Sequence, residues 1–249
     1  MTEPSYLDHG GERLAYVKRS GAGPGIVWLG GFRSDMEGNK AKAVDAWAVA
    51  AGRACVRFDY SGHGRSSGDF LQGTISRWRD DGLAVLDALT AGPQILVGSS
   101  MGGWIATLMA KARPERVAGL LLIAPATDFT EALMWEQMPE EVRRVLLQEG
   151  VWRRESACAE ECYPITRGLI EDGRWHLLLG DRHAFPFPVR ILQGMADPDV
   201  PWPHALKLAG AIDADVTVTL VKNGDHRLST PSNLRLLERA LDALAEDAS

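Results

Sequence analysis

The sequence lacks the features that mark a membrane protein, a nucleic-acid-binding protein or an exported protein. No apolar run reaches the roughly 18 residues that cross a bilayer, so we expect no membrane insertion. Basic residues are in the minority, and the net charge of −6 argues against nucleic acid or an anionic membrane as the main partner. The N-terminal residues carry no basic start and no apolar segment. They therefore predict no signal or transit peptide, and a cytoplasmic location.

Cysteine is also scarce. Three cysteines, an odd number, suit a reducing compartment better than a disulfide framework. Cys158 and Cys162 lie four residues apart, but no second pair of Cys or His residues is spaced to complete a zinc site, so we expect no metal. The Gly-rich connector at residues 59–68 lacks the Gly-Lys-Ser/Thr ending of a phosphate loop. We therefore expect no nucleotide there and no cofactor.

What the sequence does contain is a regular alternation of apolar runs and amphipathic segments over 249 residues. The apolar runs predict strands at 12–19, 25–29, 54–58, 95–97, 117–123, 189–194 and 215–221, and the segments between them predict helices at 39–51, 75–90, 104–113 and 231–246. Nearly unbroken apolar strands separated by helices specify an α/β fold with a mostly parallel sheet covered on both faces. Residues 20–25 predict a turn, and His9 is expected to precede the fold.

The alternation stops between residues 126 and 188, a segment that we call the insertion. Residues 131–150 predict a helix, and the remainder is short and irregular. We expect a single-domain core formed by residues 1–125 and 189–249. Both ends of the insertion lie near the carboxyl ends of predicted strands, where open α/β sheets carry their sites. The insertion is therefore expected to be a helical lid over that crevice.

The pattern Gly-x-Ser-x-Gly occurs between a predicted strand and a predicted helix, with its serine at Ser100. This context is typical of a nucleophile elbow, in which a sharp turn exposes the serine hydroxyl. Gly98 and Gly102 suit it because side chains there would collide with the neighbouring strand and helix. The sequence therefore predicts Ser100 as a catalytic nucleophile.

A serine hydroxyl needs a base, and the base needs an acid to orient it. Of six histidines, only His226 lies on a short loop directly after a predicted strand and before a helix, so we predict it as the base. His63, in the Gly-rich connector, could have a structural or a substrate-contacting role. Asp197 follows another strand and is the predicted acid, with Asp199 and Asp128 as its rivals. Asp225, next to the base, points the wrong way for an orienting partner.

Acyl transfer also needs donors for the oxyanion. The backbone N–H of Met101, after the nucleophile, is one candidate, and the N–H of Phe32, after two glycines at a strand end, is the other. An apolar group near the mouth could line an acyl pocket or pack the lid. This group comprises Leu133, Met134, Trp135, Met138 and Trp202.

Several blocks together resemble the α/β-hydrolase subgroup of the mitochondrial palmitoyl-protein thioesterase. These blocks are residues 31–41, 57–64, 92–104, 194–197, 200–202 and 225–227. The resemblance spans about residues 12–125 and 189–245 and is weakest in the insertion. It implies an α/β-hydrolase fold with an eight-stranded type of sheet. It also implies a metal-free serine hydrolase that cleaves acyl thioesters or acyl-glucuronide esters of a small molecule or an S-acylated protein.

By position, the resemblance assigns Ser100, Asp197 and His226 to the nucleophile, acid and base, and Phe32 and Met101 to the oxyanion donors. Two alternatives stay open on the same fold. One is a carboxylesterase or lactonase acting on small esters, and the other is a non-catalytic binding protein. Acyl-chain length and leaving group are not determined by the sequence.

Overall fold

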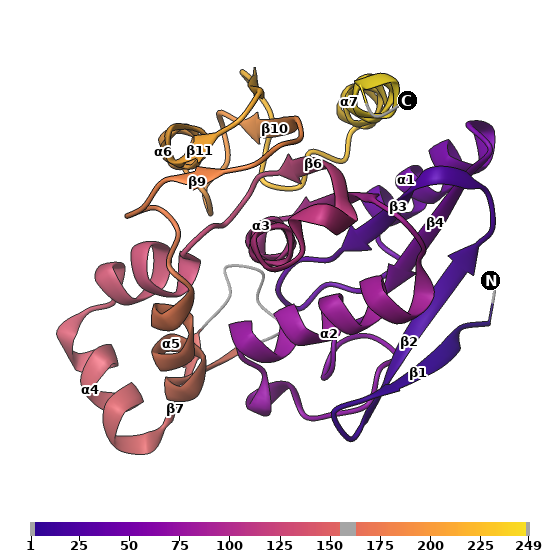
Figure 1. The fold of residues 1–249 in the computed structure, drawn as a ribbon. Coiled ribbons are helices and arrows are strands. Elements are labelled where there is room, and N and C mark those ends of the chain that lie inside the picture. The colour runs from indigo at the N-terminus through magenta and orange to yellow at the C-terminus, as the bar shows by residue number, and fades with distance from the viewer. Residues whose placement is uncertain (1–2, 155–162, 248–249) are drawn as a thin grey trace.

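The computed structural model describes residues 3–154 and 163–247. Its centre is an eight-stranded sheet in the order β1-β2-β4-β3-β5-β6-β10-β12, drawn in Figure 1. The strands are β1 (Ser5–His9), β2 (Glu12–Arg19), β3 (Ala22–Leu29), β4 (Arg53–Phe58), β5 (Gln94–Ser99), β6 (Val117–Ile123), β10 (Val189–Gly194) and β12 (Val216–Val221). Pairings of β1 with β2 and of β2 with β4 are antiparallel, and the other pairings in this sheet are parallel. The predicted α/β-hydrolase fold is confirmed.

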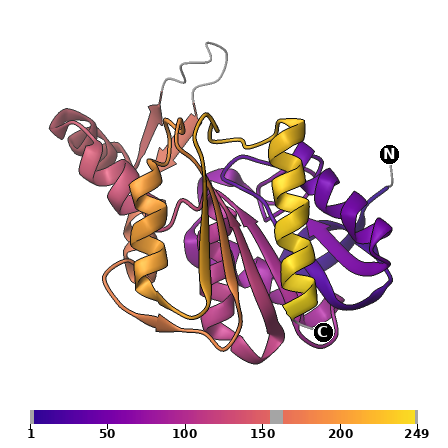
Figure 2. The ribbon, with the colours of Figure 1, turned by 90° about the horizontal axis from the view of Figure 1, so that it is seen from above.

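Helices cover both faces of the sheet. The helices are α1 (Asn39–Ala50), α2 (Ile75–Leu89), α3 (Met101–Ala112), α6 (Trp202–Ala211) and α7 (Pro231–Asp247). Side chains of α1 and α7 pack into one apolar cluster, and those of α2, α3 and α6 pack into the other. Figure 2 shows α6 and α7 on opposite sides of the strands. The central parallel strands are thus buried on both sides, as their continuous apolar runs require, whereas the edge strand β12 is only partly buried.

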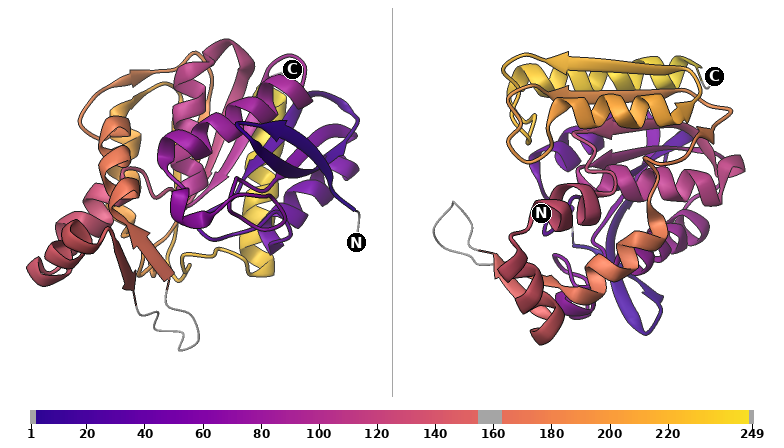
Figure 3. Two further views of the ribbon diagram at one scale, coloured as in Figure 1. Left: turned by 90° about the horizontal axis from the view of Figure 1, so that it is seen from below. Right: turned by 90° about the vertical axis from the view of Figure 1, so that its left-hand side faces the viewer.

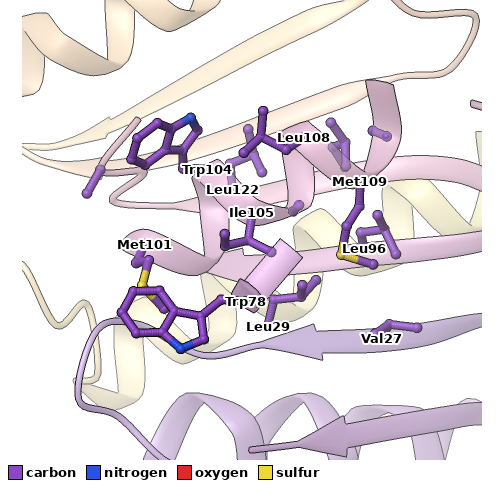
Figure 4. Close-up of a cluster of buried hydrophobic side chains, with 14 of the residues drawn as sticks. Val27, Leu29, Trp78, Leu96, Met101, Trp104, Ile105, Leu108, Met109 and Leu122 are labelled. Carbon is purple, nitrogen blue, oxygen red and sulfur yellow. The ribbon is translucent and has the colours of Figure 1, made fainter. Parts of the chain in front are cut away.

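The larger cluster lies directly behind the elbow. Trp78 and Trp104 are fully buried there together with Met101, the first residue of α3 (Figure 4). Burial of each such side chain contributes about 2 to 3 kcal/mol. The start of α3 is therefore anchored by packing, which fixes the position of the turn before it.

The N-terminal edge of the sheet differs from the sequence prediction. His9 does not precede the fold, because it ends β1, which pairs antiparallel with β2. Likewise, the predicted turn at 20–25 is wrong, since β3 begins at Ala22. Ala22 pairs with Arg53, and a register shift separates this pairing from the regular ladder that resumes at Ile26. Glycines within a strand can mark such an irregularity, so composition alone favoured a turn.

The insertion contains a small substructure of its own. It consists of a π-helix (Phe129–Met134), a 3-10 helix (Trp135–Gln137), α4 (Glu140–Glu149), β7 (Val151–Arg154), β8 (Tyr163–Thr166), α5 (Arg167–Gly173), a 3-10 helix (Arg174–His176) and β9 (His183–Ala184). β7 pairs antiparallel with β8, and β9 pairs with β11 (Ile212–Asp213). Short 3-10 helices also cover Phe70–Gln72 and Pro114–Arg116. Figure 3 shows α4, β7 and β8 projecting from one side of the molecule.

The helix predicted at 131–150 is broken into three pieces. Pro139 precedes α4, and the residue before a proline is disfavoured in helical geometry, so the earlier turns cannot continue into α4. Among the described residues, no helix is both long and apolar enough to cross a bilayer. Cys158 and Cys162, considered above for a metal, lie outside the described residues.

Candidate active site

The turn at Ser100 has the geometry of a nucleophile elbow. Ser100 adopts φ 56° and ψ −120°, between the end of β5 and the start of α3. A Cβ on Gly98 would lie 2.2 Å from the carbonyl oxygen of Gly102, and a Cβ on Gly102 would lie 2.1 Å from that of Leu29. Neither approach is possible for a larger residue. The strained serine is therefore held by glycine contacts that the spacing of the motif predicts.

Ser100, His226 and Asp197 form a hydrogen-bonded chain, although they are far apart in sequence. The Ser100 Oγ lies 3.0 Å from the His226 Nε2, and the His226 Nδ1 lies 2.7 Å from the Asp197 Oδ2. Acceptance of the serine proton at Nε2 places the ring proton on Nδ1, where it is donated to Asp197. The Asp197 side chain is fully buried, and the His226 side chain is 23% exposed. The arrangement suits proton transfer from Ser100.

The loops that carry the acid and the histidine are joined to each other. Ala196 N–H donates to the Gly224 carbonyl at 2.9 Å, and Met195 N–H donates to Val221 at 2.9 Å. A Cβ on Gly194 would lie 2.3 Å from that same Gly224 oxygen. Two loops after neighbouring parallel strands, β10 and β12, are therefore packed backbone to backbone, which fixes the distance between Asp197 and His226.

Asp197 is kept ionised by its hydrogen bonds. Burial by itself raises the pKa of a carboxyl group, but the bond from His226 and backbone N–H donors outweigh it and lower the pKa of Asp197. Those donors are Val200 and Asp199, both at 2.9 Å. The Gln193 side chain adds a bond of 3.1 Å to the oxygen that faces His226. An ionised Asp197 can stabilise the positive charge that His226 carries when its ring is protonated.

The rival acids occupy other places. Asp199 is exposed, and its contribution to the acid loop is its backbone N–H. Asp128 is buried, and its carboxylate accepts the N–H groups of Leu178 and Leu179 within the insertion. The Asp225 carboxylate accepts the N–H of Leu228 and so closes the turn around His226. In this geometry Asp197 is the carboxylate that orients the imidazole.

The other histidines bond elsewhere. His176 contacts the Ser76 hydroxyl at 2.6 Å, His183 contacts the Leu178 carbonyl at 2.9 Å, and His204 contacts the Thr127 carbonyl at 2.6 Å. His9 belongs to the edge strand β1. His63 is only 4% exposed and accepts the N–H of Arg33, which is the residue after Phe32. Of the two roles left open for His63, burial favours the structural one.

The two predicted oxyanion donors come from two backbone segments next to the nucleophile. Met101 begins α3 directly after Ser100. Phe32 follows Gly31, where a Cβ would lie 3.3 Å from the Ser100 Cβ and 3.9 Å from its Oγ. The loop after β3 therefore passes against the serine. An oxyanion formed on an acyl group at Ser100 would lie between these two backbone segments.

The candidate acyl-pocket residues lie in and beside the insertion. Met138 is buried in the insertion's own cluster with Leu146, Ile165 and Ile170. The Trp135 ring contacts two guanidinium groups, 5.2 Å from that of Arg143 and 4.8 Å from that of Arg174. Trp202 begins α6 and is half-buried. The contacts of Met138 and Trp135 account for these two residues as packing of the insertion, and an acyl-binding role of all three stays a prediction.

One group of potential metal ligands is found among the described residues, namely Asp197, Asp199 and His226. Their ligand atoms lie within 4.8 Å of one another. However, the His226 Nδ1 and the Asp197 Oδ2 are already bonded to each other. The cluster is explained by the hydrogen-bonded chain from Ser100.

Sequence reasoning did not single out Lys40 or Gln193. The Lys40 ammonium donates to the carbonyl of Arg227, the residue after the candidate base. Burial lowers the pKa of Lys40 to about 8, although the Asp225 and Asp197 carboxylates oppose the shift. Lys40 does fall within the block 31–41 that carries the family resemblance, so its position was visible but its contact was not. Gln193 lies next to the end of the apolar strand β10, and nothing in the local sequence indicated its contact with Asp197.

Comparison with known proteins agrees with the fold and the site. A family model described as serine aminopeptidase, S33 matches residues 34–153. Human mitochondrial palmitoyl-protein thioesterase ABHD10 is 40% identical over 238 residues, which cover 95% of this chain and 78% of that protein.

Two solved structures are also similar. α/β-hydrolase domain-containing protein 10 from mouse superposes with a TM-score of 0.92 at 38% identity, covering 100% of both chains. A candidate hydrolase from Agrobacterium vitis S4 superposes with a TM-score of 0.93 at 43% identity, covering 98% of both chains.

The comparison corrects the predicted location. The relatives from orangutan, human and cattle, 39 to 40% identical to this chain, are named as mitochondrial proteins. The cytoplasmic prediction rested on the composition of the first residues alone and is wrong by this comparison. A catalytic core carries no local pattern that reports its compartment.

The similarity to these relatives extends over 95% of the chain and includes the strand ends that carry Ser100, Asp197 and His226. It therefore concerns the whole fold, the insertion included. At 40% identity over that length, this chain belongs to the ABHD10 family of α/β-hydrolases.

Proposed function

We propose that this protein is a serine hydrolase that cleaves acyl thioesters and esters through a covalent acyl-enzyme on Ser100. The observation that carries the proposal is the chain of hydrogen bonds from Ser100 through His226 to Asp197 at the carboxyl edge of the sheet. Family membership supports an ester or thioester as the bond that is cleaved. A non-catalytic role would give no reason to keep a strained serine beside a base.

In the acylation step, the His226 Nε2 takes the proton from the Ser100 Oγ as that oxygen bonds to the acyl carbon. The carbonyl electron pair moves to oxygen, and the N–H groups of Phe32 and Met101 stabilise the resulting oxyanion. Asp197 stays ionised and stabilises the imidazolium. When the tetrahedral intermediate collapses, the bond from carbon to the leaving sulfur or oxygen breaks, and His226 donates its proton to the leaving group.

Deacylation reverses these roles with water as the nucleophile. His226 removes a proton from water as the water oxygen attacks the acyl carbon, and the same N–H groups hold the second oxyanion. The proton then returns to the Ser100 Oγ as the acid product leaves. The cycle uses no group beyond those of the chain, the substrate and water.

We further propose that the insertion, residues 126–188, acts as a lid on the core formed by residues 1–125 and 189–249. The ring of Tyr163 in β8 lies 6.1 Å from the ring of Phe32, so the insertion reaches the loop that carries the proposed oxyanion donor. We propose that the pocket for the acyl chain is lined by Trp135, Met138 and Trp202. The substrate is an S-acylated protein or a small acyl ester, by analogy with the palmitoyl-protein thioesterases named above.

A fluorophosphonate probe and a graded substrate panel test the proposal together. The panel comprises acyl-CoA, S-acyl peptides and p-nitrophenyl esters of increasing chain length. Wild-type protein should be labelled and should turn over a thioester. Ser100→Ala should lose labelling and about 10⁶-fold in turnover, because the nucleophile is gone. Ser99→Ala, the matched control on the adjacent buried serine, should keep most of the activity.

Turnover retained in Ser100→Ala would exclude the proposed mechanism. Activity on p-nitrophenyl esters with none on any thioester would restrict the enzyme to carboxylesterase chemistry.

A further inference from the structure

The connector between β4 and α2, residues 59–68, packs against the loop that carries Phe32. We call residues 30–36 the oxyanion loop. Two side chains of the connector accept backbone N–H groups of this loop. The His63 Nε2 accepts from Arg33 at 3.2 Å, and the Asp59 Oδ1 accepts from Met36 at 2.7 Å. The loop is therefore held at two points by side chains from another strand end.

The His63 ring has one protonation state that fits its partners. Because Nε2 accepts the Arg33 N–H, the ring proton belongs on Nδ1, which lies 3.3 Å from the Ser61 carbonyl. Ser61 is itself fixed, since its N–H and its hydroxyl both donate to the buried Asp81 carboxylate at 2.8 and 2.7 Å. Burial lowers the pKa of His63 to about 4, so the accepting form is the one present at neutral pH.

The held residue is in an unfavourable backbone conformation. Arg33 has φ 57°, a region that non-glycine residues seldom adopt and keep only where the surroundings hold them. The N–H that His63 accepts belongs to the peptide that joins Phe32 to Arg33. Loss of that bond would leave the strained backbone at Arg33 less firmly held, and the preceding peptide, which carries the Phe32 N–H, would lose the anchor next to it.

Packing of aromatic rings also helps to hold Phe32 in place. The Phe32 ring lies 5.1 Å from Phe70 and 5.8 Å from Trp78, and the His63 ring lies 5.1 Å and 5.2 Å from the same two rings. The side chain of Phe32 and the group that holds its neighbour thus share one aromatic cage. His63 is only 4% exposed, so its ring is enclosed by these neighbours.

We propose that His63, together with Asp59, is a positioning residue that holds the Phe32 N–H where the oxyanion forms. This inference rests on the proposed serine hydrolase function. It assigns a role in turnover to the Gly-rich connector, which contributes no group to the chemistry itself. The connector acts through the oxyanion loop, so its effect falls on the transition state and not on substrate binding.

The test compares His63→Phe with His63→Gln. Phenylalanine keeps the aromatic packing but has no acceptor, whereas the glutamine oxygen can accept at the position of Nε2. His63→Phe should lower kcat about 10- to 100-fold with KM nearly unchanged, since small misplacements at the reacting centre have effects of this order. Affinity for a trifluoromethyl ketone, which forms an oxyanion on Ser100, should fall by the same factor. His63→Gln should recover kcat to within about 5-fold.

Two controls keep the result interpretable. His183→Phe makes the same change at another buried histidine, one that contacts the Leu178 carbonyl in the insertion, and should leave kcat within about 3-fold. Asp59→Ala removes the acceptor of the second anchor and decides the matter if His63→Phe does not fold. It should lower kcat about 3- to 10-fold at unchanged KM.

Wild-type kcat in folded His63→Phe, with Ser100→Ala inactive, would overturn the positioning role and leave the hydrolase proposal intact. Equal losses in His63→Phe and His63→Gln would also overturn it, because the acceptor would then be irrelevant. Unchanged kcat in Asp59→Ala would do so if the histidine variant is unfolded. Activity that survives in Ser100→Ala would instead be a failure of the hydrolase proposal.

Discussion

The carboxyl edge of the sheet and the insertion are built in different ways. At the sheet edge, glycines bring backbone segments to within 2.3 Å of where a Cβ would lie, and buried side-chain acceptors fix the loops. The insertion has its own apolar cluster of four buried residues, and its Trp135 ring contacts two arginines. The edge is fixed by approach of backbone to backbone, whereas the tightest contact of a described glycine in the insertion, that of Gly173, is with the Thr130 side chain.

This difference separates two tasks. The chemistry proposed at Ser100 needs groups that are fixed to fractions of an ångström, and the close packing of the edge is suited to hold them. Substrate choice needs a surface that can vary without disturbing the chemistry, and the insertion meets the oxyanion loop through side-chain rings, such as those of Tyr163 and Phe129 against Phe32. The following predictions test whether the two regions are as separate as this comparison suggests.

The largest expected effect in this series is at the acid. Asp197→Asn should lower kcat by about 10⁴-fold, because an amide would stabilise the wrong tautomer of His226. The exposed neighbour makes a matched control, and Asp199→Asn should lower kcat less than about 10-fold. Steady-state kinetics on one p-nitrophenyl ester measure both. The reverse order of the two losses would move the acid to Asp199.

A pair of glycines compares the regions directly. Gly102→Ala should destabilise the protein by more than about 3 kcal/mol, because the new Cβ would lie 2.1 Å from the Leu29 oxygen. In the insertion, a Cβ at Gly168 would meet nothing nearer than the Thr166 hydroxyl at 4.0 Å. Gly168→Ala in α5 should raise stability by up to about 1 kcal/mol. Urea unfolding measures both changes in stability. Similar losses of stability in the two variants would contradict the proposed difference between the sheet edge and the insertion.

Acid pH should lower the stability of the protein through His63, which lies at the carboxyl edge of the sheet. Its pKa falls from 6.5 to about 4 on folding, so between these values the folded histidine is neutral and the unfolded one is protonated. The unfolded state then binds more protons, and stability rises with pH across this window. The contribution of His63 is fully present above pH 6.5 and is lost as the pH falls through about 4, a change of about 3 kcal/mol.

Unfolding free energies measured from pH 4 to pH 7 check this. The glutamine variant at position 63 should show a shallower loss of stability on the acid side than wild type. An unchanged slope would mean that another group carries the acid sensitivity.

The smallest effect is expected in the insertion. Met138→Ala should change the preference between long and short acyl chains by about 10-fold in kcat/KM, a size typical of apolar pocket contacts. The rate of fluorophosphonate labelling should stay near that of wild type, because the sheet edge is untouched. An equal loss on every chain length would mean that Met138 serves the packing of the insertion alone.

The sequence predicts most of the core because its signals are local. Gly98, Ser100 and Gly102 lie within five residues, and the apolar strands alternate with amphipathic helices along the chain. The insertion was harder, since Pro139 interrupts what otherwise looks like one helix. The strand β1 was missed because its pairing partner β2, and not its own polar residues, holds it in the sheet.

By itself, then, the sequence determined the elbow and most of the strands and helices of the core, because each of these is written within a few neighbouring residues. Tertiary structure decided which distant groups meet. It brought Lys40 to the carbonyl beside His226, and His63 to the loop that carries Phe32. The physical reason is that hydrogen bonds between the loops at separate strand ends depend on the order and register of the strands in the sheet. No local sequence pattern encodes the distance between such loops.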